Sequence, residues 1–177
     1  GHHAASDNGS IAYIGGSGDD TLTFENKLAY RSGNSTFDMS RGGNNTFEAG
    51  DDAASSSGSI VYIGGPGEDS LTFGDDLAEQ SGTVTLDLDA DTASDIVTFQ
   101  GSIGESGGTV TIKNFNFNDD TIDVPGGGAA TTEITDNGVG DLTWNRAGGS
   151  HTIVFKGIGA GGTGVVATLA DLAADII

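Results

Sequence analysis

Short apolar runs alternate with polar residues along the first two thirds of the chain. The segment 10–24 pairs Ile-Ala-Tyr-Ile with Leu-Thr-Phe, and it recurs 49 residues later at 59–73 with 11 of 15 positions identical. Turn-forming Gly, Asn, Asp and Ser separate the runs, and no helical period is present, so the pattern predicts short β-strands. A long-period repeat of this kind is typical of stacked coils.

The predicted architecture is all-β, a parallel β-roll or β-helix-like solenoid over residues 10–106. Residues 1–9 form a polar lead, 10–58 and 59–106 form two repeat units, and 107–177 form a β-rich cap with a short terminal helix. We expect eight apolar residues to face the core: Ile14, Leu22, Phe24, Ile63, Leu71, Phe73, Leu86 and Phe99.

Each copy of the repeat contains the pattern Gly-Gly-x-Gly-x-Asp-x-Leu-x, at 15–23 and at 64–72. Three glycines in four residues allow positive φ and bring backbone carbonyls close to a ligand. Carbonyl oxygens combined with carboxylates form the hard oxygen shell that suits Ca²⁺. The pattern therefore predicts calcium ligands among Asp19, Asp20, Glu68, Asp69, Gly16, Gly18, Gly65 and Gly67. The alternative is a pair of glycine-rich turns that carry solvated acids.

Both nonapeptides resemble the repeat of the RTX (repeats-in-toxin) family of secreted bacterial proteins. The resemblance implies a parallel β-roll that winds around Ca²⁺. The family runs its nonapeptides in tandem, whereas these two copies lie 49 residues apart. They can share an ion only if the intervening coils bring them together.

Weaker copies of the motif lie between and after the two nonapeptides. The segments 33–37 and 43–47 keep the glycine and the apolar residue, and they place Ser35 and Asn45 where Asp20 stands. We expect turn chemistry, core packing and an Asn ladder to hold these coils without ions. Further along, an acidic run alternates with small and apolar residues, and it is either a low-affinity cation strip or a solvated face: Asp87, Asp89, Asp91 and Asp95.

The amino-acid composition limits the classes of partner that the protein can bind. Six Lys and Arg against 26 Asp and Glu give a net charge of −20, which opposes compaction unless cations neutralise it and which excludes nucleic acid and anionic membranes. Cysteine is absent, so neither disulfides nor thiolate metal sites form. No apolar run has the roughly 18 residues of a membrane span. The leading Gly1-His2-His3 is interpreted as a tag remnant, or as a native terminus able to chelate Cu²⁺ or Ni²⁺.

The last third differs from the repeats. The segment 117–124 resembles the strand that follows RTX repeats, and the ending Asp175-Ile176-Ile177 resembles an uncleaved type I secretion signal. Two further strands, at 141–144 and 151–155, predict a hairpin, and 165–177 has helical spacing. These features imply an extracellular or cell-surface bacterial protein that is exported without an N-terminal signal segment.

No catalytic constellation emerges. His151 has no nucleophile motif nearby, and adjacent acids in glycine-rich turns are better explained as cation ligands or surface charge. We therefore expect a non-enzymatic, calcium-binding structural protein that self-associates outside the cell into a layer, sheath or fibre. The alternative is the C-terminal calcium-binding and secretion module of a larger exoenzyme or adhesin. Carbohydrate or ice binding by a flat β-face would require a regular Thr or aromatic ladder, and the repeat offers only Thr21, Thr23 and Thr72.

Overall fold

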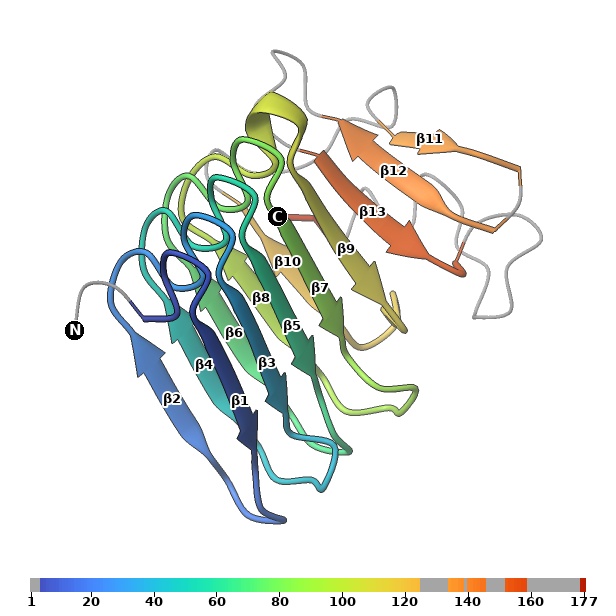
Figure 1. The fold of residues 1–177 in the computed structure, drawn as a ribbon. Helices are drawn as coiled ribbons and strands as arrows, with labels where there is room; N and C mark the ends of the chain where they lie inside the picture. Colours follow the sequence, from blue (N-terminus) through green and yellow to red (C-terminus); the bar gives the residue numbers. More distant parts are fainter. Residues whose placement is uncertain (1–3, 125–133, 139, 146–151, 159–175) are drawn as a thin grey trace.

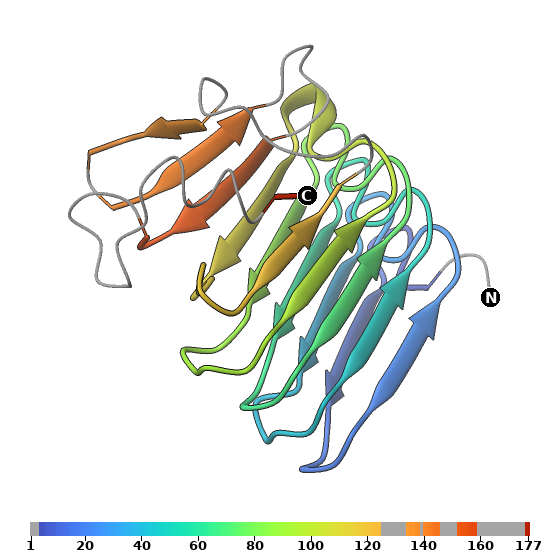
Figure 2. The same ribbon diagram turned by 180° about the vertical axis from the view of Figure 1, so that it is seen from behind.

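The chain folds into a parallel β-solenoid closed at one end by a small antiparallel extension (Figures 1 and 2). The computed structural model describes residues 4–124, 134–138, 140–145, 152–158 and 176–177. Two sheets face each other across the core. The larger, sheet A, has the strand order β1-β3-β5-β7-β9-β13-β12-β11, and the smaller, sheet B, has the order β10-β8-β6-β4-β2.

The strands are three to five residues long, in keeping with the short apolar runs. Sheet A contains β1 (Ser10–Ile14), β3 (Asn34–Asp38), β5 (Ser59–Ile63), β7 (Thr83–Asp87), β9 (Thr109–Lys113), β11 (Ile134–Asp136), β12 (Leu142–Asn145) and β13 (Thr152–Lys156). Sheet B contains β2 (Thr21–Phe24), β4 (Thr46–Ala49), β6 (Ser70–Phe73), β8 (Ile96–Phe99) and β10 (Thr121–Asp123). A single 3₁₀ turn, η1, spans Glu105–Gly107.

One coil consists of one strand from each sheet. Successive coils begin at residues 10, 34, 59, 83 and 109, so a coil takes 24 to 26 residues. The 49-residue repeat therefore covers two coils, and each predicted unit, 10–58 and 59–106, contains two. Parallel pairing continues past residue 106, because β9 pairs with β7 and β10 pairs with β8. The fifth coil thus belongs to the solenoid rather than to the cap.

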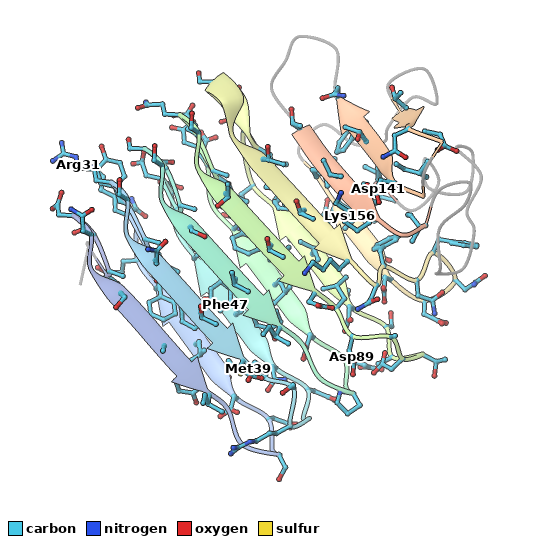
Figure 3. All side chains as sticks on the ribbon, turned by 45° about the vertical axis from the view of Figure 1, so that its right-hand side comes forward. Arg31, Met39, Phe47, Asp89, Asp141 and Lys156 are labelled. Atoms are coloured by element: carbon cyan, nitrogen blue, oxygen red, sulfur yellow. The ribbon has the colours of Figure 1, made fainter. Side chains whose placement is uncertain are left out.

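The core lies between the two sheets and contains a column of aromatic rings. Phe47 contacts Phe37, Tyr62 and Phe73 at centroid distances of 4.9, 5.5 and 5.7 Å, and Figure 3 shows it between the sheets. The predicted core residues Leu71, Phe73, Leu86 and Phe99 are buried. Leu22 and Phe24 pack on the core but are only half-buried, since no coil precedes theirs among the described residues.

The inward orientation predicted for Ile14 and Ile63 is wrong. Side chains alternate across a strand, and in β1 and β5 the inward positions belong to Ile11, Tyr13, Ile60 and Tyr62. Ile14 is 62% exposed. A tyrosine can face the core when its hydroxyl has a buried partner, and alternation alone does not reveal that partner.

A glycine closes the connection from sheet B back to sheet A in every coil. At Gly33, Gly58, Gly82 and Gly108, an added Cβ would lie 1.5 to 1.9 Å from the carbonyl oxygen of Ala5, Ala29, Ala54 or Ala78 in the preceding coil. Only a residue without a side chain permits this approach. The preceding residues in this connection have positive φ, for example Ala54 (55°) and Ala78 (56°), and they hydrogen-bond from coil to coil.

The C-terminal extension continues sheet A. β13 pairs parallel to β9, and β12 and β11 then add antiparallel strands, which confirms the predicted strand pairing of the hairpin. Lys156 donates to Asp141 at 2.7 Å in this region (Figure 3). Ile176 is buried and bridges to Ile122 on β10, so sheet B is also covered at this end.

Several predicted features lie outside the described residues. They are the terminal helix over most of 165–177, His151, the lead residues 1–3, and Asp175 of the predicted export signal. In the part of the chain that the structure describes, no helix has the length and apolar character needed to cross a membrane.

Candidate functional site

The two predicted calcium-binding acids, Asp20 and Asp69, occupy equivalent positions in a column of polar residues. Each residue of this column immediately precedes a strand of sheet B, where the chain turns from sheet A to sheet B. We call this column the inner ladder, and its members are Asp20, Asn45, Asp69, Asp95 and Asp120. All but Asp20 are buried, and Asp20 is half-buried in the first coil.

Hydrogen bonds join each rung of the inner ladder to the next. The backbone N–H of Asp20 donates to Oδ1 of Asn45 at 3.1 Å, and that of Asn45 donates to Oδ1 of Asp69 at 3.0 Å. The N–H of Asp69 donates to Asp95 at 2.8 Å, and that of Asp95 donates to Asp120 at 3.0 Å. Each side chain therefore satisfies a buried N–H of the preceding coil, which would otherwise be unpaired at the turn.

The second oxygens of Asp20 and Asp120 accept hydrogen bonds within their own coils. Oδ2 of Asp20 accepts from the N–H of Gly16 at 3.0 Å, and Oδ2 of Asp120 accepts from the N–H of Asn116 at 2.7 Å. The first bond closes the glycine-rich turn of the first nonapeptide, and the second closes the equivalent turn of the fifth coil, which has no glycine.

Tyrosine hydroxyls complete two of the rungs. Tyr62 donates to Oδ2 of Asp69 at 3.0 Å, and Tyr13 donates to Oδ1 of Asp20 at 3.2 Å. Burial and the nearby charge of Asp69 raise the pKa of Tyr62 far above its usual range, so its hydroxyl remains a donor.

Asn45 shows that a rung works without charge. Its Nδ2 donates to Oδ1 of Asp69 at 2.9 Å and to the carbonyl of Gly43 at 3.1 Å, while its Oδ1 accepts from Asp20. The predicted Asn contribution to a ladder is therefore present at Asn45. Ser35 is not part of it: it lies on β3, buried between Ile11 and Ile60, and its hydroxyl has no hydrogen-bond partner.

The remaining rungs place three acids in consecutive coils. Burial raises the pKa of Asp69, Asp95 and Asp120, and neighbouring carboxylates add to the effect at Asp95 and Asp120. The pKa reaches about 8 at Asp95 and about 6 at Asp120. The fold therefore favours the protonated form of these carboxyls, because a charge is costly in a weakly polar interior.

A second ladder runs along the opposite turn, after the strands of sheet B. The N–H of Asp51 donates to Asn26 at 3.1 Å, that of Asp75 donates to Asp51 at 3.0 Å, and that of Ser102 donates to Asp75 at 2.7 Å. This ladder is exposed, and its hydrogen bonds from Ser102 lower the pKa of Asp75. The same residue types thus form an exposed ladder, in which the pKa of Asp75 is lowered, and a buried one, in which burial raises the pKa of Asp69, Asp95 and Asp120.

The other predicted ligands lie on the outside of the turns. Asp19 and Glu68 are exposed in a separate column with Asn44, whose N–H donates to Asp19 at 2.8 Å and whose Oδ1 accepts from the N–H of Glu68 at 3.1 Å. Gly16 and Gly18 are exposed, Gly65 is buried and Gly67 is half-buried. A whole coil, the one with Asn44 and Asn45, separates the two nonapeptides, so they do not form one shared shell.

These contacts bear on whether the predicted ligands can bind a calcium ion. The oxygens of Asp20 and Asp69 accept N–H and O–H groups within the ladder, and calcium binding by these two acids stays a prediction. Within the described residues, no cluster of three or more His, Cys, Asp or Glu side chains is arranged to hold a metal. Exposed Asp19 and Glu68 retain the hard oxygen chemistry that Ca²⁺ prefers, and calcium binding there stays a prediction.

Asp95 and Asp120 were not identified as rungs from the sequence. Asp95 was grouped with Asp87, Asp89 and Asp91, yet Asp87 lies on β7 and accepts from Asn114 at 2.6 Å. The signal that identifies the rungs is the spacing of 24 to 26 residues between successive rungs, in step with the glycine of each coil.

Comparison of the chain with known protein families, with curated proteins and with solved structures finds no match.

Proposed function

We propose that this protein is an extracellular structural protein that associates with further copies through the uncovered end of its solenoid. The observation that carries the proposal is the open end, which we define as the free edges of β1 and β2. Among the residues that the structure describes, each of these strands pairs on one side only, with β3 and β4 respectively. Two parallel rows of unpaired backbone groups are a template for a further pair of strands.

The open end also leaves part of the core incompletely covered. Leu22, Phe24 and Tyr13 are half-buried, whereas the residues at the same positions two coils later, Leu71, Phe73 and Tyr62, have no exposed surface. A second copy would cover these side chains and pair both edges at once. The opposite end is capped by β13 and Ile176. End-to-end association therefore joins two open ends, and a layer or sheath needs lateral contacts as well.

Charge supports a role for calcium. Twenty-six acids repel one another across any contact between copies, and exposed carboxylates such as Asp19 and Glu68 line the turns. Calcium at these outer carboxylates would lower that repulsion. Calcium is scarce inside cells and abundant outside, so the chain would remain loose until export and associate afterwards. The resemblance of 117–124 and 175–177 to export-related segments supports the extracellular location.

A second candidate is a module of a larger exoenzyme or adhesin. The observation that favours it is the turn over residues 4–9, which repeats the geometry of the later turns: the N–H of Ala29 donates to Ala4 at 2.8 Å, as that of Ala54 donates to Leu28 at 2.8 Å. Ala5 also has positive φ, like Ala29 and Ala54. A preceding coil would stack on this turn without rearrangement.

Sedimentation velocity with circular dichroism, in chelator and in millimolar Ca²⁺, tests the proposal. The backbone of Gly9 and Gly15 bonds to β3, so alternation directs the N–H of Ala12 to the open edge. Ala12→Pro therefore removes a donor from the open end only, and Ala12→Ser is its matched control. We expect calcium to convert wild type and Ala12→Ser into larger particles and Ala12→Pro to stay monomeric. A wild type that stays monomeric at high concentration with calcium would contradict the proposal.

A further inference from the structure

The outward side of sheet A carries a regular, uncharged array of short side chains. We call it the neutral face and define it as the first and third residues of β1, β3, β5, β7 and β9. Every position is Ser, Thr, Asn, Val or Ala, and all are exposed or half-buried. The described chain leaves this side of β1 to β9 open (Figure 1).

Strand register makes the neutral face regular in two directions. Thr83 pairs with Thr109 and Thr85 with Thr111, and the pairing of the earlier coils is equally in register. Neighbouring side chains are therefore about 4.8 Å apart across the strands and about 6.7 Å apart along them. Parallel strands of a solenoid hold this spacing rigidly, because β3, β5, β7 and β9 are each bonded on both sides.

The neutrality of this face is unusual for a chain with a net charge of −20. Among the described residues, charged side chains on the same side of β1 to β9 are confined to the strand ends, at Asp38, Asp87 and Lys113, and Lys156 of β13 lies next to Lys113. The outward side of sheet B differs, because Glu48 and Asp123 interrupt its Thr column. Of these two outward surfaces in the described part of the chain, only the neutral face lacks charged side chains.

The size and chemistry of the neutral face indicate which kind of ligand it can bind. Five strands and two rows cover roughly 25 Å by 10 Å, whereas a stable protein partner needs about 800 Å² per side. The face has no aromatic ring on which a sugar could stack, and it has no charge to attract an ion or a charged polymer. A flat, rigid, periodic array of hydroxyl and methyl groups instead matches a neutral periodic solid made of hydrogen-bonding molecules.

We propose that the neutral face binds ice. The Thr and Ser hydroxyls hydrogen-bond to lattice water, and the Thr, Val and Ala methyl groups exclude mobile water between them. Within this face, Thr83, Thr85, Thr109 and Thr111 form a contiguous block across β7 and β9. This proposal is independent of self-association, because the open end and the neutral face share only β1.

Ice shaping and thermal hysteresis of the folded protein test this proposal. The matched pair of variants is Thr85→Lys, in the middle of the neutral face, and Thr98→Lys, a half-buried Thr in the middle of sheet B. We expect faceted ice crystals and measurable hysteresis with wild type and Thr98→Lys, and loss of both with Thr85→Lys. If Thr85→Lys does not fold, the double variant T85S/T111S takes its place in the test. It removes two methyl groups with little risk to folding and should weaken hysteresis.

Three outcomes would overturn the proposal. The first is the absence of ice shaping by the wild type, and the second is an equal loss of hysteresis in Thr98→Lys and Thr85→Lys. The third is a wild type without ice activity whose self-association is abolished by Thr85→Lys alone. Binding to microcrystalline cellulose in place of ice would assign the face to a polysaccharide and would also refute it.

Discussion

The backbone N–H of Asp69 donates to Oδ1 of Asp95 at 2.8 Å, in a buried contact between neighbouring coils. Two acids are thus stacked in the interior, and the next rung, Asp120, adds a third. Asn45 performs the same task in the second coil with a neutral side chain. The inner ladder therefore depends on hydrogen-bond acceptors at fixed spacing, and the charge on its acids opposes folding rather than supporting it.

Asp95→Asn should stabilise the protein above pH 7. The amide keeps an oxygen to accept from Asp69 and gains an N–H that can donate to Asp120, as Asn45 donates to Asp69. The cost of a buried charge disappears. Urea unfolding at pH 8 should give a higher midpoint than wild type, with little change at pH 5. Asp19→Asn, which removes an exposed charge, is the control; an equal gain in both variants would mean that net charge alone is responsible.

The stability of the wild type should fall as pH rises from 5 to 9. Asp95 has a folded pKa of about 8 against 3.8 in the unfolded chain, and the pKa of Asp120 is about 6. Their stabilising contribution is complete below the unfolded pKa and is lost as pH rises through the folded values. Hydrogen bonds lower the pKa of Asp38 and Asp75, so their contribution is lost below about pH 4. Thermal denaturation against pH should therefore show a maximum between these limits; a plateau up to pH 9 would contradict the assignment.

Gly82→Ala should prevent the coils from closing. Its Cβ would lie 1.9 Å from the carbonyl oxygen of Ala54, so backbone must move, at a cost of roughly 3 kcal/mol or more. Gly18→Ala is the control, because no atom lies within 4 Å of its Cβ, and a change within about 0.5 kcal/mol is expected. Urea unfolding of the two variants compares them directly. Equal stabilities would mean that the coils do not approach each other this closely.

Tyr62→Phe should destabilise more than Tyr13→Phe. Tyr62 is fully buried and donates to Asp69, so its removal leaves a buried acceptor without its donor and costs about 1 to 3 kcal/mol. Tyr13 makes the equivalent bond to Asp20 in the half-exposed first coil, where water can replace it. Chemical denaturation measures both, and a larger loss in Tyr13→Phe would contradict the buried role of Tyr62.

The sequence predicted the solenoid because the alternation and the long repeat are local signals. It did not reveal that 49 residues are two coils. The partner of Asp20 is Asn45, 25 residues later, and that of Asp69 is Asp95, 26 residues later, and the segments around these partners have low similarity. The glycines at 33, 58, 82 and 108 mark the coil period, but their role depends on a carbonyl in another coil.

The orientation of the motif acids could not be predicted for the same reason. A carboxylate after a glycine-rich turn suits a cation and a stacked N–H equally well, and only the neighbouring coil decides between them. Tyr13 and Tyr62 contained a usable signal, because each stands seven residues before an acid of the motif. The neutral face was hidden because its Thr residues gather only when strands such as β7 and β9, which begin 26 residues apart, pair in register.

Carbon-13 NMR titration of the aspartate side-chain carboxyls tests the inner ladder most directly. The account predicts apparent pKa values of about 8 and about 6 for the coupled carboxyls of Asp95 and Asp120, assigned with Asp95→Asn and Asp120→Asn. Calcium should leave them unchanged, since the ladder oxygens accept hydrogen bonds rather than bind the ion. Carboxyls that all titrate below about pH 4, or values that fall when calcium is added, would contradict it.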